Sequence, residues 1–145
     1  KGMWLEFRRV LFRSNLDEYV LANPPATGKD IDRCNNQMTK INAPRLPVDF
    51  VAFLQICNGM QYNGMQIFGS KQNEIIHFTA QNRIYYERFD EINDLIFFGQ
   101  IDDDLYTYNA QTQKYQARDI CSFDIWDEYN SFSEFFSKEM MKWLA

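Results

Sequence analysis

The sequence is poor in the residues and motifs that most catalytic sites require. It has one histidine, His77, and three widely spaced cysteines, Cys34, Cys57 and Cys121. Three unpaired cysteines support neither a disulfide framework nor paired zinc ligands, and they favour a reducing compartment such as the cytoplasm. The chain contains no glycine-rich phosphate loop, GxSxG, HExxH or CxxC motif. We therefore expect no enzyme, metal or cofactor, and we interpret His77 as a structural residue.

Long hydrophobic runs are also missing. No apolar stretch reaches the roughly 18 residues of a membrane span, and no secretory signal pattern is present. What the chain does have is 46% hydrophobic and 17% aromatic residues in a length of 145. This composition predicts one folded domain with a substantial core.

The first residues carry an unusual signal. The segment LEFRRVLFRS, residues 5–14, is basic and amphipathic. It also resembles the translation of a common sequencing-library adapter, so we interpret residues 1–14 as adapter-derived and residues 15–145 as the native domain. We expect the gene's own start to be missing. Removing this segment takes away four basic residues and one acidic residue, which changes the net charge from −5 to −8. Such a domain repels nucleic acid and anionic membranes and attracts basic partners.

Periodicity and capping signals predict helices in the first half of the chain. We expect a short helix at 15–22 and a second at 27–40, with Thr27 as its cap and Ile31, Cys34 and Met38 on one face. A third begins near Pro47 and ends at Asn58–Gly59. A strand follows at 65–69. A helix is predicted at 73–88, with Ala80 and Ile84 among its inward residues.

Strand patterns dominate the second half. Residues 94–99 read as a strand buried on both faces, 104–109 and 114–119 as an antiparallel pair, and 123–129 as a final edge strand. Ser131 and Glu134 form a capping-box pattern before a last helix. The order of elements predicts an α+β fold, a single domain with a mainly antiparallel sheet and helices packed on one side.

The triplet Asp102, Asp103 and Asp104 lies between two apolar segments that are predicted as strands. A solvated acidic connection is the simplest interpretation, a partner-facing patch the second, and a catalytic or metal site the third. The tyrosines Tyr106, Tyr108 and Tyr115 likewise favour a cross-strand packing ladder over an exposed interface, with RNA stacking third.

Several segments resemble the SUKH superfamily, the group named for its Syd, US and yeast cell-wall-assembly-regulator members. LPVDFVAFLQICNGMQYNGMQIFG at 46–69 looks closest to the YrhA-like bacterial branch, and LIFFGQIDDDLYTYN and WDEYNSFSEFFSKEM fit the later strands and closing helix. QIDDD departs from the more glycine-rich connection of the family. The residues that carry the resemblance are Leu46, Pro47, Phe50, Phe53, Leu54, Asn58, Gly59, Asn63, Gly64, Gly69, Gly99, Phe132 and Phe135.

The resemblance implies a SUKH-like domain without enzymatic activity, and many bacterial members are immunity proteins that bind and block toxins. We therefore expect a cognate, basic protein toxin as partner, of a nuclease type, and no nucleic acid, membrane or small-molecule substrate. The candidate partner-binding residues are Asp102, Asp103, Asp104, Tyr106, Asp124, Asp127 and Glu128. A regulatory or scaffold module is the alternative, and a metal-dependent enzyme using Asp102–Asp104 is the third hypothesis.

Overall fold

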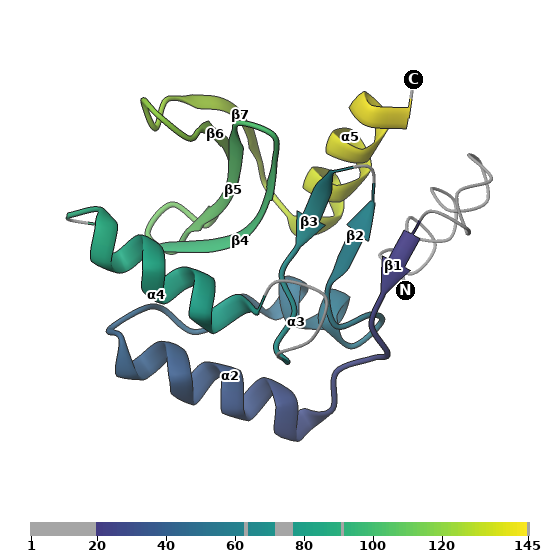
Figure 1. Cartoon of the computed structure of the whole chain (residues 1–145), viewed down its shortest axis with the longest axis vertical. Helices are drawn as coiled ribbons and strands as arrows, with labels where there is room; N and C mark the ends of the chain where they lie inside the picture. The colour runs from purple at the N-terminus through teal and green to yellow at the C-terminus, as the bar shows by residue number, and fades with distance from the viewer. Residues whose placement is uncertain (1–19, 63, 72–76, 91, 145) are drawn as a thin grey trace.

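The computed structural model describes residues 20–62, 64–71, 77–90 and 92–144. Figure 1 shows the strands and helices of the fold. In chain order they are β1 (Val20–Ala22), α2 (Gly28–Lys40), α3 (Val48–Leu54), β2 (Met60–Tyr62), β3 (Met65–Ile67), α4 (Phe78–Arg88), β4 (Leu95–Ile101), β5 (Asp104–Asn109), β6 (Lys114–Asp119), β7 (Ile125–Tyr129) and α5 (Phe132–Leu144).

The seven strands form one sheet in sequential order, and every neighbouring pair is antiparallel. The predicted α+β single domain, with helices on one side of an antiparallel sheet, is confirmed. The half of the sheet from β4 to β7 is strongly curved, and α2 and α4 run side by side below it (Figure 1). Strands β1 and β7 form the two edges of the sheet.

The predicted helix caps are present. Thr27 accepts a hydrogen bond from the Asp30 backbone N–H at 3.1 Å, and the Thr27 N–H donates to the Asp30 carboxylate at 2.8 Å, which completes a capping box. Ile31, Cys34 and Met38 are buried as expected. At α5, Ser131 Oγ accepts from the Glu134 N–H at 3.1 Å. The start of α5 is therefore fixed locally.

An aromatic cluster forms the centre of the core. The ring centroid of Phe132 lies 5.3 Å from Phe50 and 4.8 Å from Phe53, and Phe98 lies 4.9 Å from Phe135. These contacts join α3, α5 and β4, so the predicted inward residues of three elements meet as expected. Leu46 and Leu54 are also buried, and Pro47 is the N-cap of α3.

A buried asparagine closes the gap where β3 stops pairing with β4. Asn82 is fully buried in α4, its Nδ2 donates to Phe97 O at 2.7 Å, and its Oδ1 accepts from Phe97 N at 2.8 Å. The side-chain amide thus replaces a missing strand. The predicted inner face of this helix is wrong, because Ala80 and Ile84 are exposed. The face of α4 that packs on the sheet is the one that carries the polar Asn82.

Two glycines allow close approach of the backbone. A Cβ at Gly99 would lie 2.4 Å from Gln66 O, and one at Gly69 would lie 2.3 Å from Asn58 O. Gly99 also sits at a register shift in β4, in line with the predicted backbone bend. The predicted end of the third helix at Asn58–Gly59 is wrong, because α3 ends at Leu54. Gly59 does have positive φ, at +92°, in the connection that leads into β2.

Other turn predictions have mixed outcomes. Gly64 also has positive φ, at +88°, and Asn58 is buried, with Oδ1 accepting from the Ser70 N–H at 2.8 Å. The turn prediction at Asn63 and the interpretation of residues 1–14 fall outside the described residues. The helix predicted at 15–22 is wrong for Val20–Ala22, which form β1 by pairing with β2.

Candidate protein-binding surface

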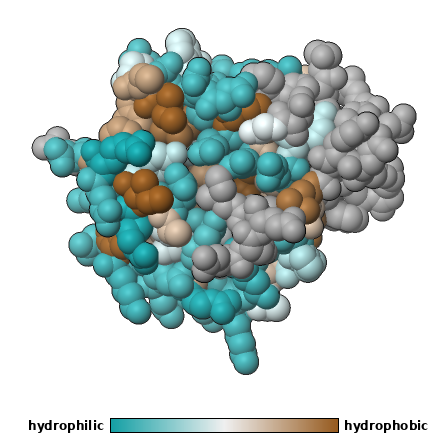
Figure 2. All heavy atoms as spheres, viewed as in Figure 1, coloured by the Kyte–Doolittle hydropathy of each residue, from teal (hydrophilic) through white to brown (hydrophobic). Residues whose placement is uncertain are grey.

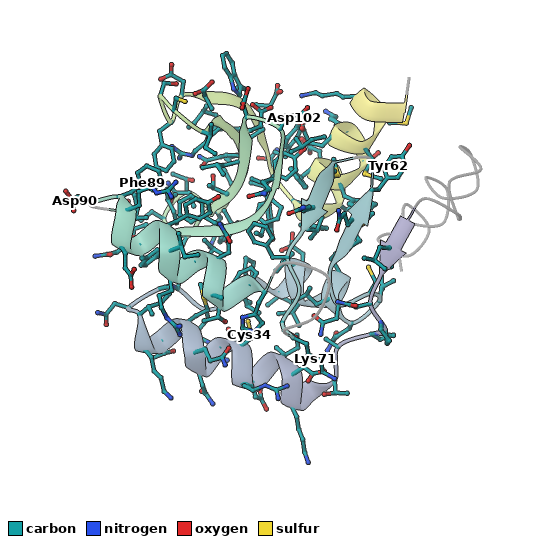
Figure 3. The ribbon with its side chains drawn as sticks, viewed as in Figure 1. Cys34, Tyr62, Lys71, Phe89, Asp90 and Asp102 are labelled. Carbon is teal, nitrogen blue, oxygen red and sulfur yellow. The ribbon has the colours of Figure 1, made fainter. Side chains whose placement is uncertain are left out.

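The aspartate triplet lies in the turn between β4 and β5. Asp102 has φ +47°, a left-handed conformation that aspartate tolerates better than most residues. Asp103 O accepts from the Ile120 N–H at 2.8 Å, and Asp104 lies directly opposite Asp119 in the β5–β6 register. The triplet is therefore adjacent to the end of β6. In Figure 3, Asp102 marks this end of the molecule.

The turn between β6 and β7 brings further carboxylates to the same end. Asp119 Oδ1 accepts from the N–H groups of Cys121 and Ser122 at 2.8 and 2.9 Å, and these bonds lower the pKa of Asp119. The Asp119 N–H donates to Asp124 O at 2.9 Å. We call Asp102, Asp103, Asp104, Asp119 and Asp124 the acidic end.

No direct ion pair balances the charge of the acidic end within the described residues. In the described part of the chain, no ion pair involves any of its five carboxylates. The nearby Lys142 is engaged by Asp127 at 2.5 Å and Glu139 at 2.8 Å. Burial raises the pKa of Asp104, and the charges of Glu139 and Asp119 raise it further. These carboxylates repel one another and are available to a positively charged partner.

The outermost strand adds apolar surface beside these charges. On β7, Trp126 is 57% exposed and Ile125 is 44% exposed, directly after Asp124. Glu128 is exposed and accepts from Gln116 Nε2 at 2.9 Å. Figure 2 shows that apolar side chains otherwise reach this view of the surface only in isolated patches. Sequence reasoning did not select Ile125 and Trp126, although large apolar residues between acids in an edge strand were a readable signal.

The predicted site residues separate into two groups. Asp102, Asp103 and Asp124 are exposed at the acidic end, and Glu128 is exposed on the neighbouring strand. Asp127 is half-buried and already paired with Lys142.

The prediction of Tyr106 as a partner-binding residue is wrong. Tyr106 is fully buried, with its ring 6.0 Å from Phe98 and 4.7 Å from Phe135, so it cannot contact a partner. Tyr106 lies on the face of β5 that α5 covers. Tyr108 and Tyr115 form the predicted cross-strand pair, with their ring centroids 4.7 Å apart.

The single histidine has a structural position. His77 is the N-cap of α4: its Nδ1 accepts from the Ala80 N–H, and its Nε2 lies 3.2 Å from Ser70 O. This network assigns the neutral tautomer with Nε2 protonated. Burial lowers the pKa of His77. Burial also raises the pKa of Cys34 to about 11 and of Cys57 to about 12, which keeps both thiols protonated.

The described ranges contain neither a metal-ligand cluster nor a membrane-spanning helix. Within the described ranges, no group of three or more His, Cys, Asp or Glu side chains could hold a metal ion. The aspartate triplet therefore gains no support as a metal site. None of the helices in those ranges is long and apolar enough to cross a membrane.

No family model matches this chain. No curated protein sequence matches it significantly.

Proposed function

We propose that this protein is a non-enzymatic bacterial immunity protein of the SUKH type, which blocks a basic toxin domain by covering its surface. The observation that carries the proposal is the acidic end, where five carboxylates from two adjacent turns converge without an ion pair in the described part of the chain. The resemblance of the sequence motifs to SUKH immunity proteins supports the same function.

The energetic argument starts from the Asp104–Asp119 pair. Like charges directly opposite in an antiparallel pair are destabilising. Burial raises the pKa of Asp104 most, the charges of Glu139 and then Asp119 raise it further, and Lys142 lowers it, so the charged form of Asp104 is disfavoured overall. A connection that served only as a soluble turn would be more stable with asparagine, serine or glycine. A basic partner surface would neutralise this repulsion, so binding would recover the stability that the free protein lacks.

Trp126 and Ile125 would supply the apolar part of the interface. Exposed tryptophan is typical of binding hot spots, and the surrounding acids fit a polar rim. Charge complementarity would accelerate association, and the tryptophan would slow dissociation.

The test uses the protein encoded by the gene immediately upstream, which the proposal predicts to be a basic toxin, purified as an inactive variant. We expect nanomolar binding and an association rate that falls with rising salt. The double variant Asp102→Asn/Asp103→Asn should lower the association rate about tenfold. The matched control Asp32→Asn/Glu87→Gln removes two exposed acids from α2 and α4, neither of which belongs to the acidic end, and should change the association rate less than about twofold.

Co-expression provides the functional readout. The wild-type protein should restore growth of cells that make the active toxin, and Trp126→Ala should protect them poorly. Equal loss of binding in both double variants would place the interface elsewhere. Absence of protection together with binding to a host protein would instead support a regulatory module.

A further inference from the structure

A second feature lies on the face of the sheet opposite α5. Thr107 and Gln116 pair across β5 and β6, and Arg118 follows two residues later on the same face. Arg118 and Phe123 line a pocket of about 360 Å³, and Thr107 and Gln116 hold Arg118 from behind. The other lining residues are Asp90, Ile92, Asp94, Leu95 and Asn109. Phe89 and Asp90, labelled in Figure 3, mark the end of α4 beside this pocket.

Neutral groups alone hold the Arg118 guanidinium. Its Nε donates to Thr107 Oγ1 and Gln116 Oε1, both at 3.1 Å, its Nη2 to Gln116 Oε1 at 2.7 Å, and its Nη1 to Phe123 O at 3.3 Å. The ring of Phe123 lies beneath it, 5.5 Å from Cζ. Glu128 is hydrogen-bonded to the far side of Gln116 and takes no direct bond from Arg118. Among the described residues, the guanidinium is therefore held by neutral groups, and the Glu128 charge favours its charged form without a direct bond.

Two hydrogen-bond donors of this cation are not used by any described residue. An arginine has five N–H donors, and the bonds above use three of them. No ion pair of Arg118 occurs among the described residues, although the chain has an excess of acids. The other described arginines are exposed, where water compensates the charge, whereas Arg118 is half-buried. A half-buried, preoriented guanidinium fork matches a carboxylate in geometry and charge.

The walls of the pocket define the rest of the ligand. Ile92, Leu95 and Phe123 offer an apolar or aromatic surface. Asn109 Oδ1 accepts from the N–H groups of Gln111 and Thr112, which leaves the Asn109 NH₂ group to donate. Asp90 and Asp94 disfavour polyanions such as phosphate. We infer that this pocket binds a monocarboxylate on an apolar body, either a free amino acid or the C-terminal residue of a peptide.

The test is an NMR titration of the whole chain that follows the Arg118 side-chain Nε–H and the Phe123 amide. The probes are L-phenylalanine, N-acetyl-L-phenylalanine and N-acetyl-L-phenylalaninamide. We expect the two acids to shift both signals with a Kd of about 1 mM and the amide to bind at least about tenfold more weakly. Tighter binding of the free amino acid would assign the ligand as a small molecule that uses Asp90 or Asp94. Tighter binding of the acetylated acid would assign a chain terminus.

A charge variant separates this site from a purely structural arginine. Asn109→Asp keeps the oxygen that accepts from Gln111 and Thr112 and places a carboxylate in the pocket, so acid binding should fall about tenfold while the fold is retained. The control Asn36→Asp adds the same charge on the exposed face of α2 and should leave binding unchanged. The inference is overturned if acid and amide shift the signals equally, if about 10 mM acid leaves Arg118 unshifted, or if both variants bind alike.

Discussion

Replacing the half-buried Asp49 by alanine should strongly destabilise the protein. The Asp49 carboxylate accepts from the Phe132 N–H at 2.7 Å and from its neighbour Phe50 N–H at 3.0 Å, and it also accepts from the buried Tyr115 hydroxyl. One side chain therefore joins the start of α3, the start of α5 and the start of β6. Burial and the Asp49 charge raise the pKa of Tyr115, so its hydroxyl remains a donor.

The expected magnitude follows from these three bonds. Loss of the helix-capping bonds costs about 1 kcal/mol, and a buried tyrosine hydroxyl left without its charged acceptor costs about 1–3 kcal/mol. The groove next to Asp49, about 560 Å³ in volume, lets water reach part of the site and reduces the cost. We expect Asp49→Ala to lower the free energy of unfolding by roughly 2–4 kcal/mol, a large fraction of the stability of a domain this size.

Urea unfolding followed by circular dichroism would measure this change, with an unchanged slope as the sign of two-state behaviour. A double-mutant cycle with Tyr115→Phe should give a coupling energy of about 1–2 kcal/mol. Asp32→Ala, at an exposed position of α2, is the matched control and should stay within about 0.5 kcal/mol. A loss below about 1 kcal/mol for Asp49→Ala, or no coupling to Tyr115, would refute the idea that this carboxylate links the three elements.

Three further predictions concern stability. Gly99→Ala should cost at least about 1–3 kcal/mol in urea unfolding because its Cβ would meet Gln66 O, whereas Gly28→Ala, with open space around it, should be neutral or stabilising. His77 has a lowered pKa, so its contribution to stability is present above pH 6.5 and is lost as the pH falls through its folded-state value; His77→Asn keeps the cap acceptor and should remove that part of the pH dependence of unfolding. Asp104→Asn should raise Tm by roughly 1–4 °C, and an unchanged or lower Tm would contradict the proposed repulsion with Asp119.

Local signals predicted the elements that local chemistry determines. The helix at 28–40 has its cap at Thr27 and a buried Ile31–Cys34–Met38 face, and the strands β5 and β6 occupy the predicted residues. These features need only the residue's own neighbours in the chain. The apolar spacing after Pro47 and the strand pattern at 65–69 also located α3 and β3, although β2 was left unassigned.

The misses share a non-local cause. Val20–Ala22 form a strand because they pair with β2 about forty residues later, which no local periodicity reports. In α4, apolar spacing suggested Ile84 as an inward residue, but the open backbone at Phe97 required a polar partner and Asn82 turns inward. Tyr106 could be assigned to a face together with Tyr108, but not to the face that α5 covers.

For the same reason, the sequence predicted only part of the candidate site. Three consecutive aspartates are visible in the sequence, but their proximity to Asp119 and Asp124 depends on the registers of β5, β6 and β7. Those registers convert a charged turn into a concentrated negative surface that forms no ion pair in the described part of the chain.

The two charged features of this molecule follow one physical rule. A structural charge is neutralised inside the protein, as Lys142 is by Asp127 and Glu139. The acidic end and Arg118 both break that rule, with opposite sign and on different parts of the sheet, and each therefore carries a free-energy cost that an external charge can remove. Neutralising Asp104 should consequently increase stability while it weakens binding to a basic partner. If Asp104→Asn raised Tm and left the association rate with that partner unchanged, the repulsion would be real but the acidic end would not be the binding surface.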